Sequence, residues 1–97
     1  MKKEIKKLAT LLTKAGIPYE LRTDSCGNKD NQLFYPSKAN RICDAICHQY
    51  SYGYDTGLLE IMGLCENTED DVEGWLSAEE VFTRIAIHYI NNNRNYY

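Results

Sequence analysis

Three tyrosines at alternate positions are the residues of this 97-residue chain whose type and spacing most suggest a binding site. Tyr50, Tyr52 and Tyr54 alternate with serine and glycine, so in an extended segment their rings lie on one face. Aromatic rings stack on a nucleobase, and Arg22 and Arg41 add guanidinium groups that can hold a phosphate with paired hydrogen bonds. The sequence therefore predicts a site for a nucleotide-like ligand. Tyrosine and arginine are also typical anchors of protein interfaces, and the rings could simply cover the edge of a sheet.

Four cysteines could form disulfides, a metal site or part of the core. No export signal accompanies Cys26, Cys43, Cys47 and Cys65, and thiols in a reducing compartment stay reduced. Zinc would use Cys43, Cys47 and His48 with one of the other cysteines. The segment lacks the glycine turn of a zinc knuckle, and on a strand the sulfurs of Cys43 and Cys47 lie ~13 Å apart. We therefore expect small buried hydrophobic side chains, with no metal and no cofactor.

The two histidines stand in poor positions for general base catalysis. His48 directly follows Cys47, and neighbours on a strand point to opposite faces. His88 shares a helical face with Glu80 and Arg84, which is typical of a solvated surface. The sequence also contains no Gly-x-x-x-x-Gly-Lys loop, Gly-x-Gly-x-x-Gly turn or His-Glu-x-x-His motif. These patterns predict a protein that is not an enzyme.

Length and composition predict a single domain over residues 1–97. The chain is 43% apolar and 26% charged, as in ordinary globular proteins. No segment approaches the ~20 consecutive apolar residues of a membrane span, and residues 1–15 mix lysines with leucines where a signal peptide would be uniformly apolar. We therefore expect a cytoplasmic protein without membrane contact. The net charge of −3 gives no reason to bind duplex nucleic acid directly.

Helical periodicity is clearest at the two ends of the chain. Residues 2–15 predict an amphipathic helix that ends at Gly16 and Pro18, a glycine that accepts the left-handed conformation and a proline that cannot continue. Its apolar stripe is Ile5, Leu8, Ala9, Leu12 and Ala15. Ser77 and Glu80 form a capping box that begins a second helix. Its stripe is Ala78, Val81, Phe82, Ile85, Ala86, Tyr89 and Ile90. The two helices could cover one layer each or lie together on one face of a sheet.

Between the helices the pattern changes to period two. Alternation over residues 19–23 and 32–35, separated by turn formers, predicts a β-hairpin. Residues 41–50 fit either a helix or a strand, and we favour a strand. Residues 58–62 form a short apolar run bounded by glycines, which favours a buried strand. The predicted fold class is α+β, a small antiparallel sheet of three to four strands flanked by an N-terminal and a C-terminal amphipathic helix.

Charged residues are unevenly distributed along the chain. Residues 1–14 hold five lysines and one glutamate, whereas residues 60–80 hold eight acids and no base. Such regions are most simply solvated faces. They could also join two copies of the chain, or the acids of 66–73 could imitate nucleic acid. These acids are Glu66, Glu69, Asp70, Asp71 and Glu73.

The chain resembles small uncharacterised accessory proteins of phages and prophages of Gram-positive bacteria. The similar segments are Leu8–Leu12, Ala15–Arg22, Tyr35–Ser37, Ser51–Gly53, Leu58–Leu64 and Gly74–Phe82. The resemblance implies a setting, inhibition of host defence, and assigns no residue a role. Phage accessory proteins of this size and mild acidity often inhibit host defence, either by blocking CRISPR nucleases or by sequestering nucleotide second messengers such as those of Thoeris systems.

Together these observations favour a non-enzymatic phage protein that counters host immunity by sequestering a nucleotide-like signal. Tyr50, Tyr52 and Tyr54 would stack on the ligand and Arg22 and Arg41 would meet its phosphate, with neighbouring subunits of a homo-oligomer closing the site. One alternative is an inhibitor of a host defence protein such as a CRISPR nuclease, acting through its acidic surface. Another is a phage structural or regulatory protein.

Overall fold

A five-stranded antiparallel sheet and two helices make up the fold, seen in a computed structural model that describes residues 3–23, 29–47, 50–66 and 69–93. The elements are α1 (Lys3–Ala15), β1 (Glu20–Thr23), β2 (Lys29–Tyr35), β3 (Cys43–Ile46), the 3₁₀ turn η1 (Tyr54–Thr56), β4 (Leu59–Met62), β5 (Val72–Leu76) and α2 (Ala78–Asn92). The predicted α+β class is confirmed. The predicted three to four strands are one too few, while Cys26 and His48 lie outside the described residues.

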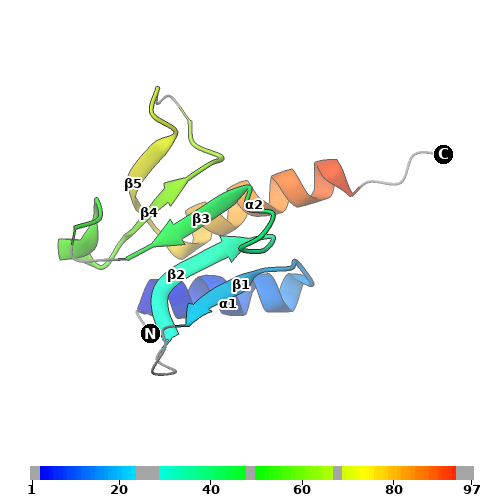
Figure 1. The fold of residues 1–97 in the computed structure, drawn as a ribbon, viewed down its shortest axis with the longest axis horizontal. Helices are drawn as coiled ribbons and strands as arrows, with labels where there is room; N and C mark the ends of the chain where they lie inside the picture. Colours follow the sequence, from blue (N-terminus) through cyan, green and yellow to red (C-terminus); the bar gives the residue numbers. More distant parts are fainter. Residues whose placement is uncertain (1–2, 24–28, 48–49, 67–68, 94–97) are drawn as a thin grey trace.

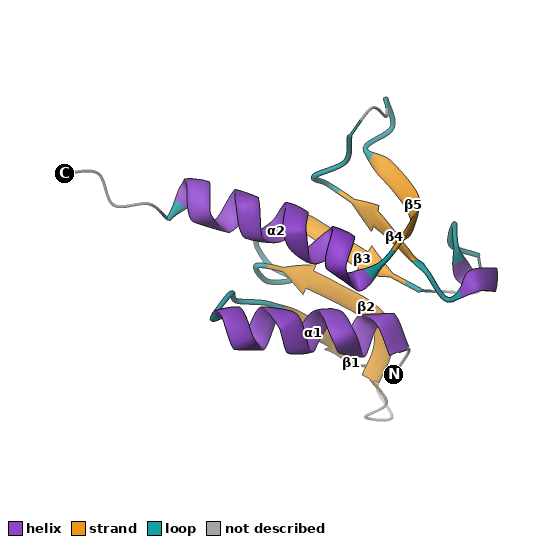
Figure 2. Ribbon diagram, turned by 180° about the vertical axis from the view of Figure 1, so that it is seen from behind, coloured by secondary structure: helices purple, strands orange, loops and turns teal. Residues whose placement is uncertain are grey.

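The strands follow one another as a meander, each pairing with its sequence neighbours. Both helices cover the same face of this sheet, behind it in Figure 1 and in front of it in Figure 2. Their N-termini lie together, because the Glu4 carboxylate accepts a hydrogen bond of 2.6 Å from the Ala78 amide. Lys7 and Glu79 add an ion pair of 2.8 Å beside it. Of the two arrangements open from the sequence, the shared face is the one formed.

Helix α1 ends as its sequence predicts. Gly16 has φ of 71°, and the amides of Gly16 and Ile17 donate to the carbonyls of Thr13 and Leu12, the pairing of a Schellman motif. Four of the five predicted stripe residues are buried, Ile5, Leu8, Ala9 and Leu12, whereas Ala15 is exposed in the last turn.

Helix α2 begins at the predicted capping box. Ser77 accepts from the Glu80 amide at 3.1 Å, and the Glu80 carboxylate accepts from the Ser77 amide at 3.0 Å. Val81 and Ile85 are fully buried, but Ile90 is 59% exposed. Figure 1 shows why, because the C-terminal part of α2 extends past the sheet.

The ambiguous segment 41–50 contains strand β3, the centre of the sheet. Cys43, Ala45 and Cys47 alternate into the core beneath the helices, each about 1% exposed. The prediction that the cysteines act as buried hydrophobic side chains is confirmed for Cys43 and Cys47, and Cys65 is half-buried.

Strand β5 is the element that the sequence analysis missed. Residues 72–76 carry a glutamate and a glycine between apolar side chains, so no regular alternation marks them. Pairing with β4 forms the strand nevertheless, with an irregularity between Leu59 and Ile61. A contact outside the segment, rather than its own pattern, decides its conformation.

Strand β5 is also tied to α2 by a partly buried ion pair. Arg84 donates from Nη1 and Nη2 to the two carboxylate oxygens of Glu73, at 2.6 and 2.8 Å. Glu73 also accepts from the Glu66 amide at 3.0 Å. The Arg84 guanidinium and this amide lower the pKa of Glu73 from 4.5 to about 2. Paired geometry of this kind is stronger than a single ionic contact.

We expect Glu73→Gln to lower the free energy of unfolding at pH 7 by about 1–3 kcal/mol, since hydrogen bonds to charged groups contribute that much. The folded-state pKa is depressed, so this stability is present above pH 4.5 and is lost as pH falls toward 2. Urea unfolding at several pH values measures it: the difference between wild type and variant should shrink over that window. Glu79→Gln is the control, and its smaller effect reflects the solvent screening of an exposed ion pair. Equal stability of Glu73→Gln and wild type at pH 7 would contradict a stabilising role of the ion pair between Glu73 and Arg84.

Candidate ligand-binding site

The three predicted tyrosines line one pocket at an end of the sheet, with a volume of about 230 Å³. They come together from a turn and the 3₁₀ turn η1, not from the extended segment that the alternation predicted. The pocket is formed by Tyr50, Ser51, Tyr52, Gly53, Tyr54, Asp55 and Trp75. All but Trp75 come from the segment between β3 and β4. Trp75 comes from β5, so the pocket exists only because the last strand pairs with β4.

A stacked pair of rings forms one wall of this pocket. The ring centroids of Tyr52 and Trp75 are 5.4 Å apart and their planes meet at 22°. The two side chains are 57% and 59% exposed, and Tyr50 is 82% exposed. Large aromatic side chains gathered at a surface in this way are typical of a recognition site rather than of core packing.

Two glycines allow the segments carrying these rings to touch. A Cβ atom on Gly74 would lie 2.2 Å from the Cβ of Tyr52, and a Cβ on Gly53 would lie 3.0 Å from the amide nitrogen of Trp75. Gly53 also has φ of 100°, a conformation that side chains disfavour. A hydrogen bond of 3.4 Å from the Trp75 amide to the Tyr52 carbonyl joins the backbones of the two segments.

Trp75 itself has a strained backbone. Its φ is 56°, in the left-handed region that bulky residues rarely adopt. Left-handed backbone costs an L-residue about 1–2 kcal/mol, and such residues gather at functional sites. Sequence reasoning missed Trp75 because its only local signal is a single tryptophan after a glycine.

The pocket lining is acidic rather than basic. Asp55 belongs to it, and next to it the Glu60 carboxylate accepts a hydrogen bond of 2.9 Å from the Tyr52 amide. No lysine or arginine is among its described lining residues. The pocket thus offers aromatic faces and a carboxylate acceptor, which suits a flat ring bearing amino groups better than it suits a phosphate.

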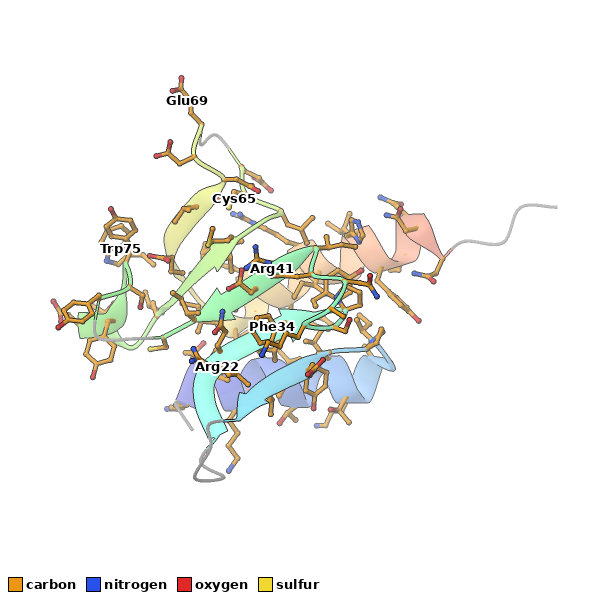
Figure 3. The ribbon with its side chains drawn as sticks, in the orientation of Figure 1. Arg22, Phe34, Arg41, Cys65, Glu69 and Trp75 are labelled. Atoms are coloured by element: carbon orange, nitrogen blue, oxygen red, sulfur yellow. The ribbon has the colours of Figure 1, made fainter. Side chains whose placement is uncertain are left out.

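The two predicted arginines lie on the open face of the sheet, opposite the helices, and are linked through Gln32 and Asp44. Arg22 donates to Gln32 Oε1 at 3.4 Å, and Gln32 Nε2 donates to Asp44 Oδ2 at 2.7 Å. Arg41 forms an ion pair of 3.5 Å with Asp44 Oδ1. Figure 3 shows Arg22 and Arg41 over the strands, apart from Trp75. The structure therefore joins the arginines to each other but not to the aromatic pocket.

Asp44 is the centre of this polar chain. Its side chain is 3% exposed although it stands on the central strand with no helix over it. Oδ1 accepts no hydrogen bond within the described part of the chain and has the Arg41 ion pair. Sequence reasoning did not single out Asp44 or connect it with Gln32, because their contact depends on the register of β2 and β3.

Two thiols and the described histidine are protonated or engaged in a hydrogen bond. Burial raises the pKa of the Cys43 thiol to about 12 and of Cys65 to about 11, so both stay protonated at neutral pH. His88 was expected on a solvated face, and this expectation is wrong. It is half-buried and hydrogen-bonded through Nδ1 to the Tyr35 hydroxyl at 2.7 Å, because α2 turns that side toward the sheet. Among the described residues no cluster of three His, Cys, Asp or Glu could hold a metal ion.

The acidic segment divides into two parts. Glu66 and Glu73 face Arg84, at 3.8 and 2.6 Å, and are partly neutralised by it. Glu69 and Asp70 are exposed, and Figure 3 shows Glu69 at the tip between β4 and β5. Asp71 is exposed as well, so the described acids of 66–73 that lie outside the ion pairs with Arg84 are Glu69, Asp70 and Asp71.

Comparison with known proteins adds no assignment: no family model, no curated protein and no solved structure matches the chain. Within the described residues, no helix has the length and apolar character needed to cross a membrane.

We expect Gly74→Ala to disrupt the pocket, because the added Cβ collides with Tyr52 and overpacking of this kind costs about 1–3 kcal/mol. The single tryptophan of the chain makes near-ultraviolet circular dichroism and fluorescence direct probes of the stack. Gly57→Ala is the control, since its Cβ would meet nothing within 4 Å and only its φ of 73° is strained. If both variants lost the Trp75 signal, or if neither did, the close approach of Gly74 to Tyr52 would not be what maintains the stack.

Proposed function

We propose that this chain is a non-enzymatic binding protein that sequesters a nucleotide-like ligand. The observation that supports it is the exposed stack of Tyr52 on Trp75 in the wall of a pocket. Stacking of a base on an aromatic side chain contributes about 1–3 kcal/mol per base. Maintaining strained backbone at Trp75 to display its indole to solvent is consistent with such a use.

Different polar groups would bind the base and the phosphate of the ligand. Asp55 provides an acceptor for the amino group of a base inside the pocket. Phosphate groups need cations, which Arg22 and Arg41 provide on the open face of the sheet. The protonated thiols of Cys43 and Cys65 and the engaged His88 favour binding without chemistry.

The biological role we propose follows from the resemblance to phage accessory proteins. The protein would act in the host cytoplasm by withdrawing a nucleotide immune signal from its receptor. The homo-oligomer expected from the sequence stays a prediction.

We expect Trp75→Ala and Tyr52→Ala to weaken ligand binding by about 5- to 150-fold, the equivalent of ~1–3 kcal/mol of stacking. Calorimetry and Trp75 fluorescence quenching measure it, across nucleosides, cyclic dinucleotides, trinucleotides and cyclic ADP-ribose isomers. Ile87→Ala is the matched control, since Ile87 is 56% exposed and lies outside the pocket. No binding by wild-type protein to any member of the panel would refute the proposal.

A second candidate function is inhibition of a host defence protein by the acidic tip. The exposed Glu69 and Asp70 at the end of the hairpin favour it, since a projecting pair of carboxylates can occupy a phosphate site. A phage structural or regulatory role would require neither the aromatic pocket nor the acidic tip.

For this second function, we expect the double variant Glu69→Lys and Asp70→Lys to lose inhibition of a CRISPR nuclease, because it reverses the charge of the tip. DNA cleavage by the nuclease in the presence of each protein is the readout. A double variant Asn91→Lys and Asn92→Lys adds lysines on the last turn of α2 and should inhibit like wild type. Full inhibition by the tip variant would exclude mimicry by these acids.

A further inference from the structure

The exposed face of helix α1 carries a groove with a volume of about 420 Å³. Lys6 and Lys14 lie about two turns apart on this face, with Thr10 and Leu11 between them. Both lysines are exposed, whereas Leu11 is half-buried and packs against the core. The groove therefore combines positive charge with a small apolar floor. We call it the lysine groove, and it is lined by Lys3, Lys6, Lys7, Thr10, Leu11 and Lys14.

Most of the positive charge in the lysine groove is uncompensated within the described part of the chain. Lys7 is the exception, since it forms an ion pair of 2.8 Å with Glu79 of α2. Lys3, Lys6 and Lys14 have no ion pair with any described residue. The groove thus offers three ammonium groups to an anionic partner.

The acidic tip, formed by Glu69 and Asp70, carries the complementary charge. Both residues are exposed and lie outside the ion pairs that Arg84 forms with Glu66 and Glu73. Figure 3 shows Glu69 projecting from the molecule between β4 and β5. Two consecutive carboxylates on a projection can reach the surface of another molecule, where each can meet a different lysine.

The lysine groove and the acidic tip cannot meet within one molecule. Helix α1 packs beside β2, near the β1 edge of the sheet, whereas the tip connects β4 and β5 at the other edge. Figures 1 and 2 show α1 and the tip at opposite ends of the molecule. Because every copy of the chain carries both patches, the tip of one copy can contact the groove of another. Two antiparallel copies can form this contact twice.

Other anionic partners fit the lysine groove less well. An amphipathic helix binds a lipid surface by inserting its apolar face, but Ile5, Leu8 and Leu12 of α1 are fully buried in the core. A nucleic acid carries one negative charge per phosphate and would meet a chain whose own net charge is −3. An acidic protein turn brings carboxylates together with aliphatic stems that can cover Leu11.

We infer that the lysine groove of α1 binds the acidic tip of a second copy of this chain. The inference goes beyond the proposed function, since it assigns an interface to the homo-oligomer expected from the sequence. No residue that lines the aromatic pocket belongs to either patch, so ligand binding in the pocket does not require the contact. The contact is ionic and weakens as salt screens the charges.

The test is charge reversal in the full-length protein, with self-association measured by analytical ultracentrifugation and native mass spectrometry. The groove variant carries Lys6→Glu and Lys14→Glu, and the tip variant carries Glu69→Lys and Asp70→Lys. Wild-type protein should associate more strongly at low salt than at high salt. Each variant should weaken self-association by about tenfold or more, because like charges then face each other. Circular dichroism and Trp75 fluorescence should stay unchanged, since the substituted side chains are exposed.

Complementation separates a specific contact from an effect of net charge. The groove variant and the tip variant should associate when mixed, since the acidic tip of the first meets the unchanged groove of the second. A chain with all four reversals keeps the net charge of −3 and should recover self-association. A wild-type protein that stays monomeric at every concentration and salt tested would overturn the inference. So would self-association that no reversal changes, or a mixture that associates no better than either variant alone.

Two further probes test the other occupants of the lysine groove, a single-stranded DNA oligonucleotide and vesicles that contain phosphatidylserine. We expect neither probe to show binding that the groove variant abolishes. Such binding by a monomeric wild-type protein would assign the lysine groove to that partner and overturn the inference.

Discussion

The structure depends on one packing constraint, the burial of a single face of the meander beneath two helices. Leu33, Ala45 and Ile61 on three adjacent strands pack against Leu8 and Val81 of the helices in one continuous core. A strand alternates its side chains, so burying this set places the intervening polar residues on the open face. The polar chain of Gln32 and Asp44 on the open face is a geometric consequence of this core.

The aromatic pocket is one of the places where the backbone departs from relaxed geometry. Gly53 and Gly74 let two segments approach closely, and Trp75 adopts a left-handed backbone between them. The remainder of β5 offsets this strain, since Glu73 is fixed by Arg84 and Leu76 is buried before the capped start of α2. A well-anchored strand thus holds an unfavourable residue at the surface, a pattern associated with recognition.

Electrostatic organisation separates two kinds of contact along the open face. The pocket combines rings with Asp55, whereas the polar chain of Gln32 and Asp44 connects two arginines. The pocket lies at an end of the sheet, whereas the polar chain lies on the open face of β2 and β3.

The sequence by itself determined the end of α1, the start of α2 and the class of the fold, because caps and alternation act between residues a few positions apart. Only the tertiary structure decided that both helices share one face, that residues 72–76 form a strand, and that Trp75 completes the pocket. It also decided the pairing of Gln32 with Asp44. These contacts depend on strand register and long-range packing, whose energies no local pattern contains.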